Sequence, residues 1–216
     1  MFNFLKKKYN KKIKGEIGYF KLEDWWINSF NDDERNLILS VYSPFGIGVD
    51  GNNINLKSNL IDTDIEYESG NTLNFLVGFF TWFSKKEYYD NIAPKIINEI
   101  EYQILNFNYP TLDLHFAYGS IMAFYYKNRE KDDCYDKAIY YCKKQIELSK
   151  ESAKGFMKEF GGRTLPGHMG YKQLSIILEK EKKYEEALFL IKKANEEGWR
   201  GDWEKRIERI NKKMKK

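Results

Sequence analysis

The spacing of apolar side chains predicts a chain that is helical over most of its length. From residue 111 onward, apolar residues recur every three or four positions, which is the period of an amphipathic helix. Residues 73–83 are almost all apolar, so the helix there is expected to be buried on most sides. The pattern predicts helices over residues 32–42, 73–83, 85–105, 112–127, 133–148, 150–160, 171–180, 184–196 and 202–213.

Two of these helices are preceded by the sequence of a capping box. In this motif the N-cap side chain and the side chain three residues later each bond to the other's backbone N–H. Asn31 with Glu34, and Ser84 with Glu87, have the required residue types and spacing. Pro94 conflicts with the second start, because proline has no N–H and interrupts a helix interior. Either a kink at Pro94 or a later helix start would remove the conflict.

Residues 43–70 lack helical periodicity, and we expect an irregular connection there, with a small hairpin turning near residues 52–53 as one arrangement. Gly46, Gly48 and Gly51 reproduce the glycine spacing of a dinucleotide-binding loop. That loop works only between a strand and a helix N-terminus, where the pyrophosphate binds. Here a predicted helix precedes the glycines and an asparagine-rich stretch follows them, so we expect no cofactor.

Two stretches in the second half of the chain align at an offset of 49 residues. Residues 135–144 (YDKAIYYCKK) and 184–193 (YEEALFLIKK) share a tyrosine, an alanine, an aliphatic residue and a lysine pair in one register. Self-similarity at this period indicates duplication of a two-helix unit, which is typical of stacked helical repeats.

Residues 171–199 resemble one tetratricopeptide repeat, a unit of two antiparallel helices. The aromatic, small and aliphatic positions of that family are held here by Tyr171, Leu174, Ser175, Leu178, Tyr184, Ala187, Ile191 and Ala194. The sequence departs from the family at Lys182, where a turn glycine is usual, and at Trp199, where a proline is usual. Residues 123–147 match less closely, with Gln145 at an alanine position. The resemblance implies a right-handed stack of helix pairs that binds peptides or proteins on its concave face.

These patterns together predict an all-α protein. A TPR-like solenoid of antiparallel helix pairs, ending in a capping helix, is expected over residues 71–216. Residues 1–70 are expected to form a helical and loop segment packed on that solenoid, so that the chain is one compact unit.

Composition and charge narrow the function classes. Hydrophobic residues make up 42% of the chain and aromatic residues 17%, which excludes an extended disordered polymer. Residues 1–14 contain six lysines and no acid, and residues 201–216 carry a local charge of +4. Removing both ends from the total of +4 leaves −6 for the rest, and lysines outnumber arginines 30 to 6. Because phosphate recognition favours arginine on one basic surface, this distribution argues against nucleic-acid binding and indicates solvated termini.

Several observations favour a cytoplasmic protein without a membrane segment. The longest apolar stretch, residues 75–83, is too short to cross a bilayer, and the first residues lack the order of a signal peptide. Two cysteines cannot form a disulfide framework, which favours a reducing compartment. The abundance of lysine, asparagine and isoleucine suggests an AT-rich bacterial or phage genome.

Candidate metal ligands are few. His115, His168, Cys134 and Cys142 are the available soft-metal ligands, and no pair has the spacing of a zinc knuckle. Residues 62–68 alternate acidic side chains but lack the glycine and glutamate of a calcium-binding loop. We therefore expect no metal site, with Cys142 in the core.

The loop of residues 161–170 is the first candidate for a binding site. It contains four glycines, and Arg163 and His168 place polar groups between two predicted helices, with Tyr171 directly after. The loop either contacts a ligand or serves only as a spacer that lets the short helix before it fold back.

The last predicted helix is the second candidate. Trp203, Ile207 and Ile210 form an apolar stripe, and Arg206 is expected on the outer, basic side. The stripe either caps the solenoid or, with Trp199, Trp203 and Arg206, forms an aromatic-anchored partner site.

The sequence therefore favours a non-catalytic helical-repeat module that binds a peptide or protein partner, since no catalytic constellation is evident. The alternative is a small-molecule or nucleotide sensor, or an enzyme. Its pocket would lie between the N-terminal segment, with Trp25 and Trp26, and the loop of residues 161–170.

Overall fold

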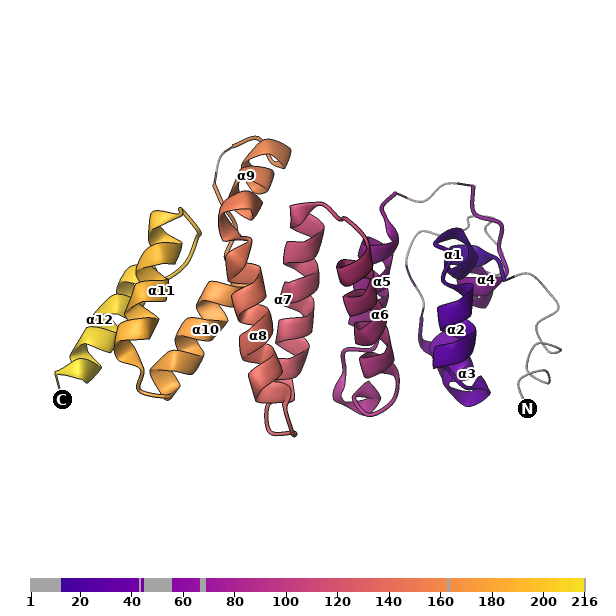
Figure 1. The fold of residues 1–216 in the computed structure, drawn as a ribbon, viewed down its shortest axis with the longest axis horizontal. Coiled ribbons are helices and arrows are strands. Elements are labelled where there is room, and N and C mark those ends of the chain that lie inside the picture. The colour runs from indigo at the N-terminus through magenta and orange to yellow at the C-terminus, as the bar shows by residue number, and fades with distance from the viewer. Residues whose placement is uncertain (1–12, 43, 45–55, 67–68, 163, 216) are drawn as a thin grey trace. The chain divides into compact units, whose positions relative to one another are not determined.

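The computed structural model describes residues 13–42, 44, 56–66, 69–162 and 164–215 (Figure 1). Within these residues the regular structure consists of twelve α-helices and one short 3₁₀ helix, with no strand, so the predicted all-α class is confirmed. The chain divides into two compact units, residues 1–107 and 108–216, which are described separately.

The first unit contains six α-helices and the 3₁₀ helix η2. Their bounds are α1 (Gly15–Tyr19), α2 (Glu23–Ser29), α3 (Asp32–Val41), α4 (Leu56–Ile61), α5 (Thr72–Trp82), η2 (Lys86–Tyr88) and α6 (Ile92–Asn106). Helix α1 packs against α4, and α5 packs against α6. The apolar helix predicted from residue 73 is α5, and Leu73, Leu76, Phe79 and Phe80 are its buried residues.

The capping box at Asn31 is confirmed. The Asn31 side chain accepts a hydrogen bond from the Glu34 N–H at 2.9 Å, and the Glu34 carboxylate accepts one from the Asn31 N–H at 2.8 Å. These bonds satisfy two donors that the first turn of α3 would otherwise leave unpaired.

The capping box predicted at Ser84 and Glu87 is wrong. Helix α6 begins at Ile92, and its cap is Asn91, whose side chain accepts from the Ile92 N–H at 2.7 Å. This later start removes the conflict at Pro94, which now lies in the first turn, where its missing N–H has no intrahelical acceptor to lose.

The expected irregular connection after residue 43 is corrected in part. Residues 56–61 form helix α4, and the Lys14 N–H donates to the Ile61 carbonyl at 2.8 Å, which ties α4 to α1. The expected hairpin turn at residues 52–53 and the glycines at 46–51 lie outside the described residues.

The second unit contains the helices from α7 to α12. Its helices are α7 (Thr111–Lys127), α8 (Cys134–Glu147), α9 (Ser149–Glu159), α10 (Met169–Lys180), α11 (Tyr184–Glu196) and α12 (Trp203–Met214). Their bounds lie within two residues of those predicted from apolar spacing. Helix α7 packs against α8, α10 packs against both α8 and α11, and α12 packs against α11 (Figure 1).

The two aligned stretches occupy matching places in α8 and α11. Ala138 and Cys142 of α8 are fully buried. Their counterparts in α11, Ala187 and Ile191, are also buried, with exposed fractions of 0% and 1%. The alanines at the first of these positions, Ala138 and Ala187, leave room for a neighbouring helix to approach closely.

The apolar stripe of α12 is confirmed at Trp203 and Ile210, which are 3% and 0% exposed. Ile207 is only half-buried. The expectation that Arg206 lies on the outer side is wrong: the residue is 7% exposed. Its guanidinium donates to the Asp202 carboxylate at 2.6 Å, and this pairing allows a charge to be buried at the edge of the helix.

Among the described residues, none of the helices has both the length and the apolar character needed to span a bilayer.

The contact between α8 and α10 generates a stability prediction. A Cβ at Gly170 would lie 2.8 Å from the Cys142 carbonyl oxygen, whereas a Cβ at Gly78 in α5 would meet no atom within 4 Å. Gly170→Ala should therefore lower the free energy of unfolding by about 1–3 kcal/mol. Gly78→Ala should raise it by about 0.5–1 kcal/mol, because alanine favours the helix. Urea denaturation followed by circular dichroism measures both, and a Gly170→Ala protein as stable as the parent would contradict the close approach.

Candidate functional site

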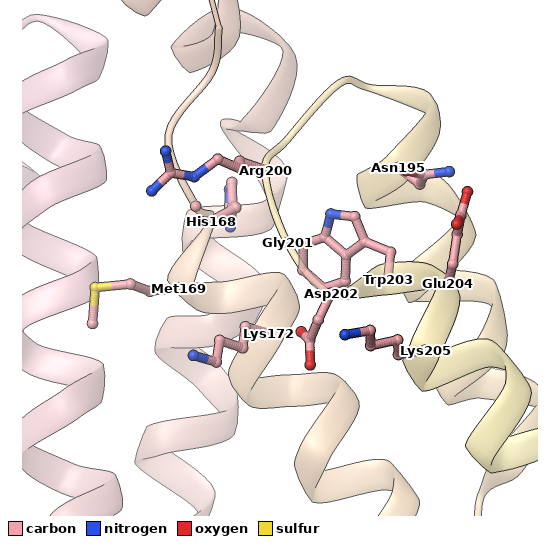
Figure 2. Close-up of a pocket in the computed structure, with 11 residues that line it drawn as sticks. His168, Met169, Lys172, Asn195, Arg200, Gly201, Asp202, Trp203, Glu204 and Lys205 are labelled. Atoms are coloured by element: carbon pink, nitrogen blue, oxygen red, sulfur yellow. The ribbon is translucent and has the colours of Figure 1, made fainter.

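A surface pocket of about 780 Å³ lies where helices α10 and α12 begin (Figure 2). All of its walls belong to the second unit. It is lined by Gly167, His168, Met169, Lys172, Asn195, Arg200, Gly201, Asp202, Trp203, Glu204 and Lys205. We call it the α10–α12 pocket.

Two hydrogen bonds to backbone carbonyls hold the segments that form this pocket. The Arg200 N–H, in the turn between α11 and α12, donates to the Pro166 carbonyl at 3.2 Å, which joins the turn to the loop before α10. The Trp203 indole N–H donates to the Trp199 carbonyl at 2.6 Å. The start of α12 is thereby fixed against the same loop that leads into α10.

A buried cluster of four rings lies behind the pocket. His115 of α7, Phe156 of α9, His168 and Trp199 form this imidazole–tryptophan cluster, and none of them is more than 7% exposed. The His168 ring centroid lies 4.7 Å from that of Trp199 and 5.0 Å from that of His115, in edge-to-face geometry. Phe156 meets Trp199 edge to face at 5.9 Å. Four separate segments of the second unit therefore meet in one desolvated cluster.

His168 also begins helix α10. It is the N-cap residue, and its Nδ1 accepts a hydrogen bond from the Tyr171 N–H at 3.2 Å. Because Nδ1 is the acceptor, the neutral ring carries its proton on Nε2. The imidazole thus takes the capping role that serine, threonine or aspartate usually fills.

Burial keeps both imidazoles of the cluster neutral. It lowers the pKa of His115 to about 4. The pKa of His168 is lowered to about 3, mainly by burial and further by the neighbouring His115. Within the described residues, neither His115 Nδ1 nor His168 Nε2 has a hydrogen-bond partner. The two rings therefore lie in an environment that strongly disfavours protonation.

Tyr171 and Trp199 converge on one carboxylate. The Tyr171 hydroxyl donates to Glu197 at 3.0 Å and also contacts the Ser149 hydroxyl at 3.2 Å. The Trp199 indole N–H donates to the same Glu197 oxygen at 3.2 Å. Burial raises the pKa of Tyr171 above its usual range, so the phenol stays protonated. These contacts give both side chains a structural role behind the pocket.

The pocket carries an excess of unpaired positive charge. Lys172, Arg200 and Lys205 are exposed and form no ion pair within the described part of the chain. The Arg206 guanidinium, at 2.6 Å, holds the pKa of Asp202 below its usual range. Asp202 is the N-cap residue of α12, and its side chain accepts no capping hydrogen bond from the helix. Glu204, in the first turn of α12, also lines the pocket, so three cations face one carboxylate that is not paired with Arg206.

The structure brings together most of the site residues predicted from the sequence. His168 and Trp203 line the α10–α12 pocket, while Tyr171, Trp199 and Arg206 lie directly behind it. Arg163 lies outside the described residues.

Trp25 and Trp26 belong to the first unit. Trp26 is fully buried, and the Trp25 indole N–H donates to the Lys95 carbonyl at 3.4 Å. Both tryptophans pack against Phe30, with centroid distances of 5.1 and 5.5 Å, so their contacts are those of a core.

The sequence did not identify the exposed apolar and basic residues that line the α10–α12 pocket. These are Met169, which is 46% exposed, and the cations Lys172, Arg200 and Lys205. Arg200 and Lys205 flank the Gly-Asp turn that starts α12, and this proximity to a helix start was the signal available in the sequence.

Metal and thiol chemistry have little support in the described residues. No group of three or more His, Cys, Asp or Glu side chains there has the arrangement of a metal site. Cys134 and Cys142 are both buried, and burial raises the pKa of Cys142 to about 12.

Comparison of the chain with protein-family models, curated proteins and solved structures finds no match.

The neutral imidazoles make the stability of the second unit depend on pH. The pKa values of His115 and His168 in the folded chain, about 4 and about 3, lie below the ordinary value of 6.5. The unfolded chain therefore takes up protons first as the pH falls, and stability is lost below pH 6.5. Between pH 8 and pH 5 we expect a loss of about 2 kcal/mol per histidine. Urea denaturation at pH 8, 6.5 and 5 measures it.

His115→Phe is the matched variant, because phenylalanine keeps a ring in the cluster and removes one titrating group. The chain has only two histidines, so this variant should lose about half as much stability as the parent over the same range. The same pH dependence in both proteins would contradict the assignment.

Proposed function

We propose that this protein is a helical-repeat module that binds a peptide or protein partner through the α10–α12 pocket. The observation that carries the proposal is the combination of Met169 with three unpaired cations around one pocket of about 780 Å³. Methionine and arginine are among the residue types enriched at protein interfaces, and Met169 and Arg200 both line this pocket.

The order of helices supports a TPR-like stack as the scaffold for this function. The pairs α7–α8 and α10–α11 carry the duplicated sequence, and α12 covers the last pair with Trp203 and Ile210. In repeat proteins such a terminal helix protects the apolar face of the final repeat. A bacterial or phage protein of the cytoplasm remains our proposal for its origin and location.

The charges define the partner that we propose. Lys172, Arg200 and Lys205 favour a segment bearing aspartate, glutamate or another anionic group, and Met169 favours an adjacent apolar side chain. Because the three cations are exposed, their effect is expected mainly on association rate and specificity, with a marked salt dependence.

A small-molecule sensor is the second candidate function. The volume of the α10–α12 pocket falls within the range typical of small-ligand sites. For this function we propose an anionic ligand, since the same three cations would contact it.

Peptide selection tests the partner-binding function. We expect 16-residue peptides selected from a random display library against the full chain to be enriched in acidic and apolar residues. Lys172→Ala/Arg200→Ala should weaken their binding at least tenfold in fluorescence anisotropy, because it removes two of the three unpaired cations. Lys154→Ala/Lys158→Ala is the control, since it removes two exposed charges from α9 and should leave binding unchanged.

Two outcomes would count against this function. Selected peptides that bind the Lys172→Ala/Arg200→Ala protein as well as the parent would exclude the pocket. A rise in melting temperature with a nucleotide or anionic metabolite, lost in the same variant, would favour the small-molecule sensor instead.

A further inference from the structure

A second concave surface is lined by residues of α8, α10 and α11. This groove of about 680 Å³, which we call the α8–α11 groove, shares no lining residue with the α10–α12 pocket. Leu174, Ile177 and Leu178 of α10 form its floor, and Ile146 of α8 and Leu190 of α11 stand on its two sides. The spacing of the floor residues along α10 produces a continuous apolar strip of one helical turn.

An exposed aromatic ring stands at the edge of this groove. Phe189 of α11 lines the groove and is 66% exposed. Tyr140, which occupies the same position of the duplicated sequence in α8, is 53% exposed. The repeated unit thus presents one exposed aromatic from each of its second helices. A large aromatic beside an apolar groove supplies the kind of anchor that dominates binding energy at interfaces.

The rim of the groove is acidic. It carries Glu147, Glu181, Glu185 and Glu186 against Lys143 and Lys183. Glu181 pairs with Lys183 at 2.8 Å, and Glu147 pairs with Lys144, outside the lining, at 3.0 Å. Glu185 and Glu186 form no ion pair within the residues that the structure describes. Four carboxylates thus face two lysines on the rim, and Glu185 and Glu186 lie in the same turn of α11 as the exposed Phe189 ring.

Helix α12 is an example, within this chain, of a basic amphipathic helix bound to α10 and α11. It packs against α11 through Trp203 and Ile210. Its Arg209 and Lys213 side chains reach Glu179 of α10 at 2.6 and 2.8 Å. Those contacts hold the pKa of Glu179 below its usual range. Helix α12 therefore binds α10 and α11 through an apolar stripe and two cations beside it.

We propose that the α8–α11 groove docks a basic amphipathic helix of a partner protein. Two or three aliphatic or aromatic side chains spaced three or four residues apart fill the apolar floor and contact Phe189. Lysine or arginine side chains on the flanks of that helix pair with Glu185 and Glu186. This is a helix-in-groove interaction, in which apolar anchors supply affinity and the charged rim sets orientation.

The direct test is the binding of a designed helical probe to the full chain. The probe is a fluorescein-labelled 16-residue peptide with leucine at helical spacing and lysine at the other positions. A matched peptide with glutamate in place of lysine controls for charge. We expect the lysine peptide to bind, with anisotropy that rises to saturation, and the glutamate peptide to bind at least tenfold more weakly.

Variants assign that binding to the groove. Phe189→Ala and Glu185→Gln/Glu186→Gln should each weaken the lysine peptide at least fivefold. Tyr102→Ala and Glu151→Gln/Glu159→Gln, which alter exposed side chains elsewhere, should leave the affinity unchanged. Circular dichroism melts identify any variant that has lost its fold, and Phe189→Leu then serves as the milder replacement. Lys172→Ala/Arg200→Ala should have no effect, which separates this result from the function of the α10–α12 pocket.

Three results would overturn the proposal. Equal binding of the lysine and glutamate peptides would remove the charge argument, and unchanged binding to the Phe189→Ala and Phe189→Leu proteins would place the peptide elsewhere. Concentration-dependent dimerisation of the full chain in analytical ultracentrifugation, abolished by Phe189→Ala, would assign the groove to a second copy of the chain.

Discussion

The burial of two uncharged imidazoles is the constraint on which the second unit depends. His115 and His168 meet Trp199 and Phe156 in a cluster that joins α7, α9, the start of α10 and the turn before α12. A charged imidazole in such a place would carry a large desolvation penalty, so the cluster forms only while both rings stay neutral. Because His168 also caps α10, the same ring fixes both the packing and the start of the helix that borders the pocket.

Because the imidazole–tryptophan cluster must stay uncharged, the charged side chains of the α10–α12 pocket lie on its solvent-facing wall. The interior side is occupied by rings, and the one buried cation of α12, Arg206, is neutralised by Asp202 at 2.6 Å. The remaining cations, Lys172, Arg200 and Lys205, extend from the ends of the elements that the cluster holds in place. The α8–α11 groove carries the opposite sign of charge, because four glutamates and only two lysines line it. The second unit therefore presents two surfaces of opposite charge, one where α10 and α12 begin and one between α8 and α11.

Periodicity identified the helices of the second unit well because each of them buries one apolar stripe. It failed where tertiary contacts decide the outcome. Helix α6 begins at Ile92, after its cap Asn91, although Ser84 and Glu87 have the sequence of a capping box. Helix α4 forms in a segment without a helical pattern, where α1 packs on it. His168 and Trp203 were recognised as candidates from the glycine-rich loop and the last helix. The cations of the pocket were not, because only the folded turn brings Arg200 and Lys205 beside Lys172.

The protonation state of the two histidines tests this account most directly. Long-range ¹H–¹⁵N correlation spectra of the full chain, labelled with ¹⁵N-histidine, report the charge and tautomer of each ring between pH 8 and pH 5. The account predicts that both rings remain neutral throughout, with the His168 proton on Nε2 and Nδ1 as acceptor. A ring that titrates near its ordinary pKa of 6.5, or a His168 proton on Nδ1, would contradict it.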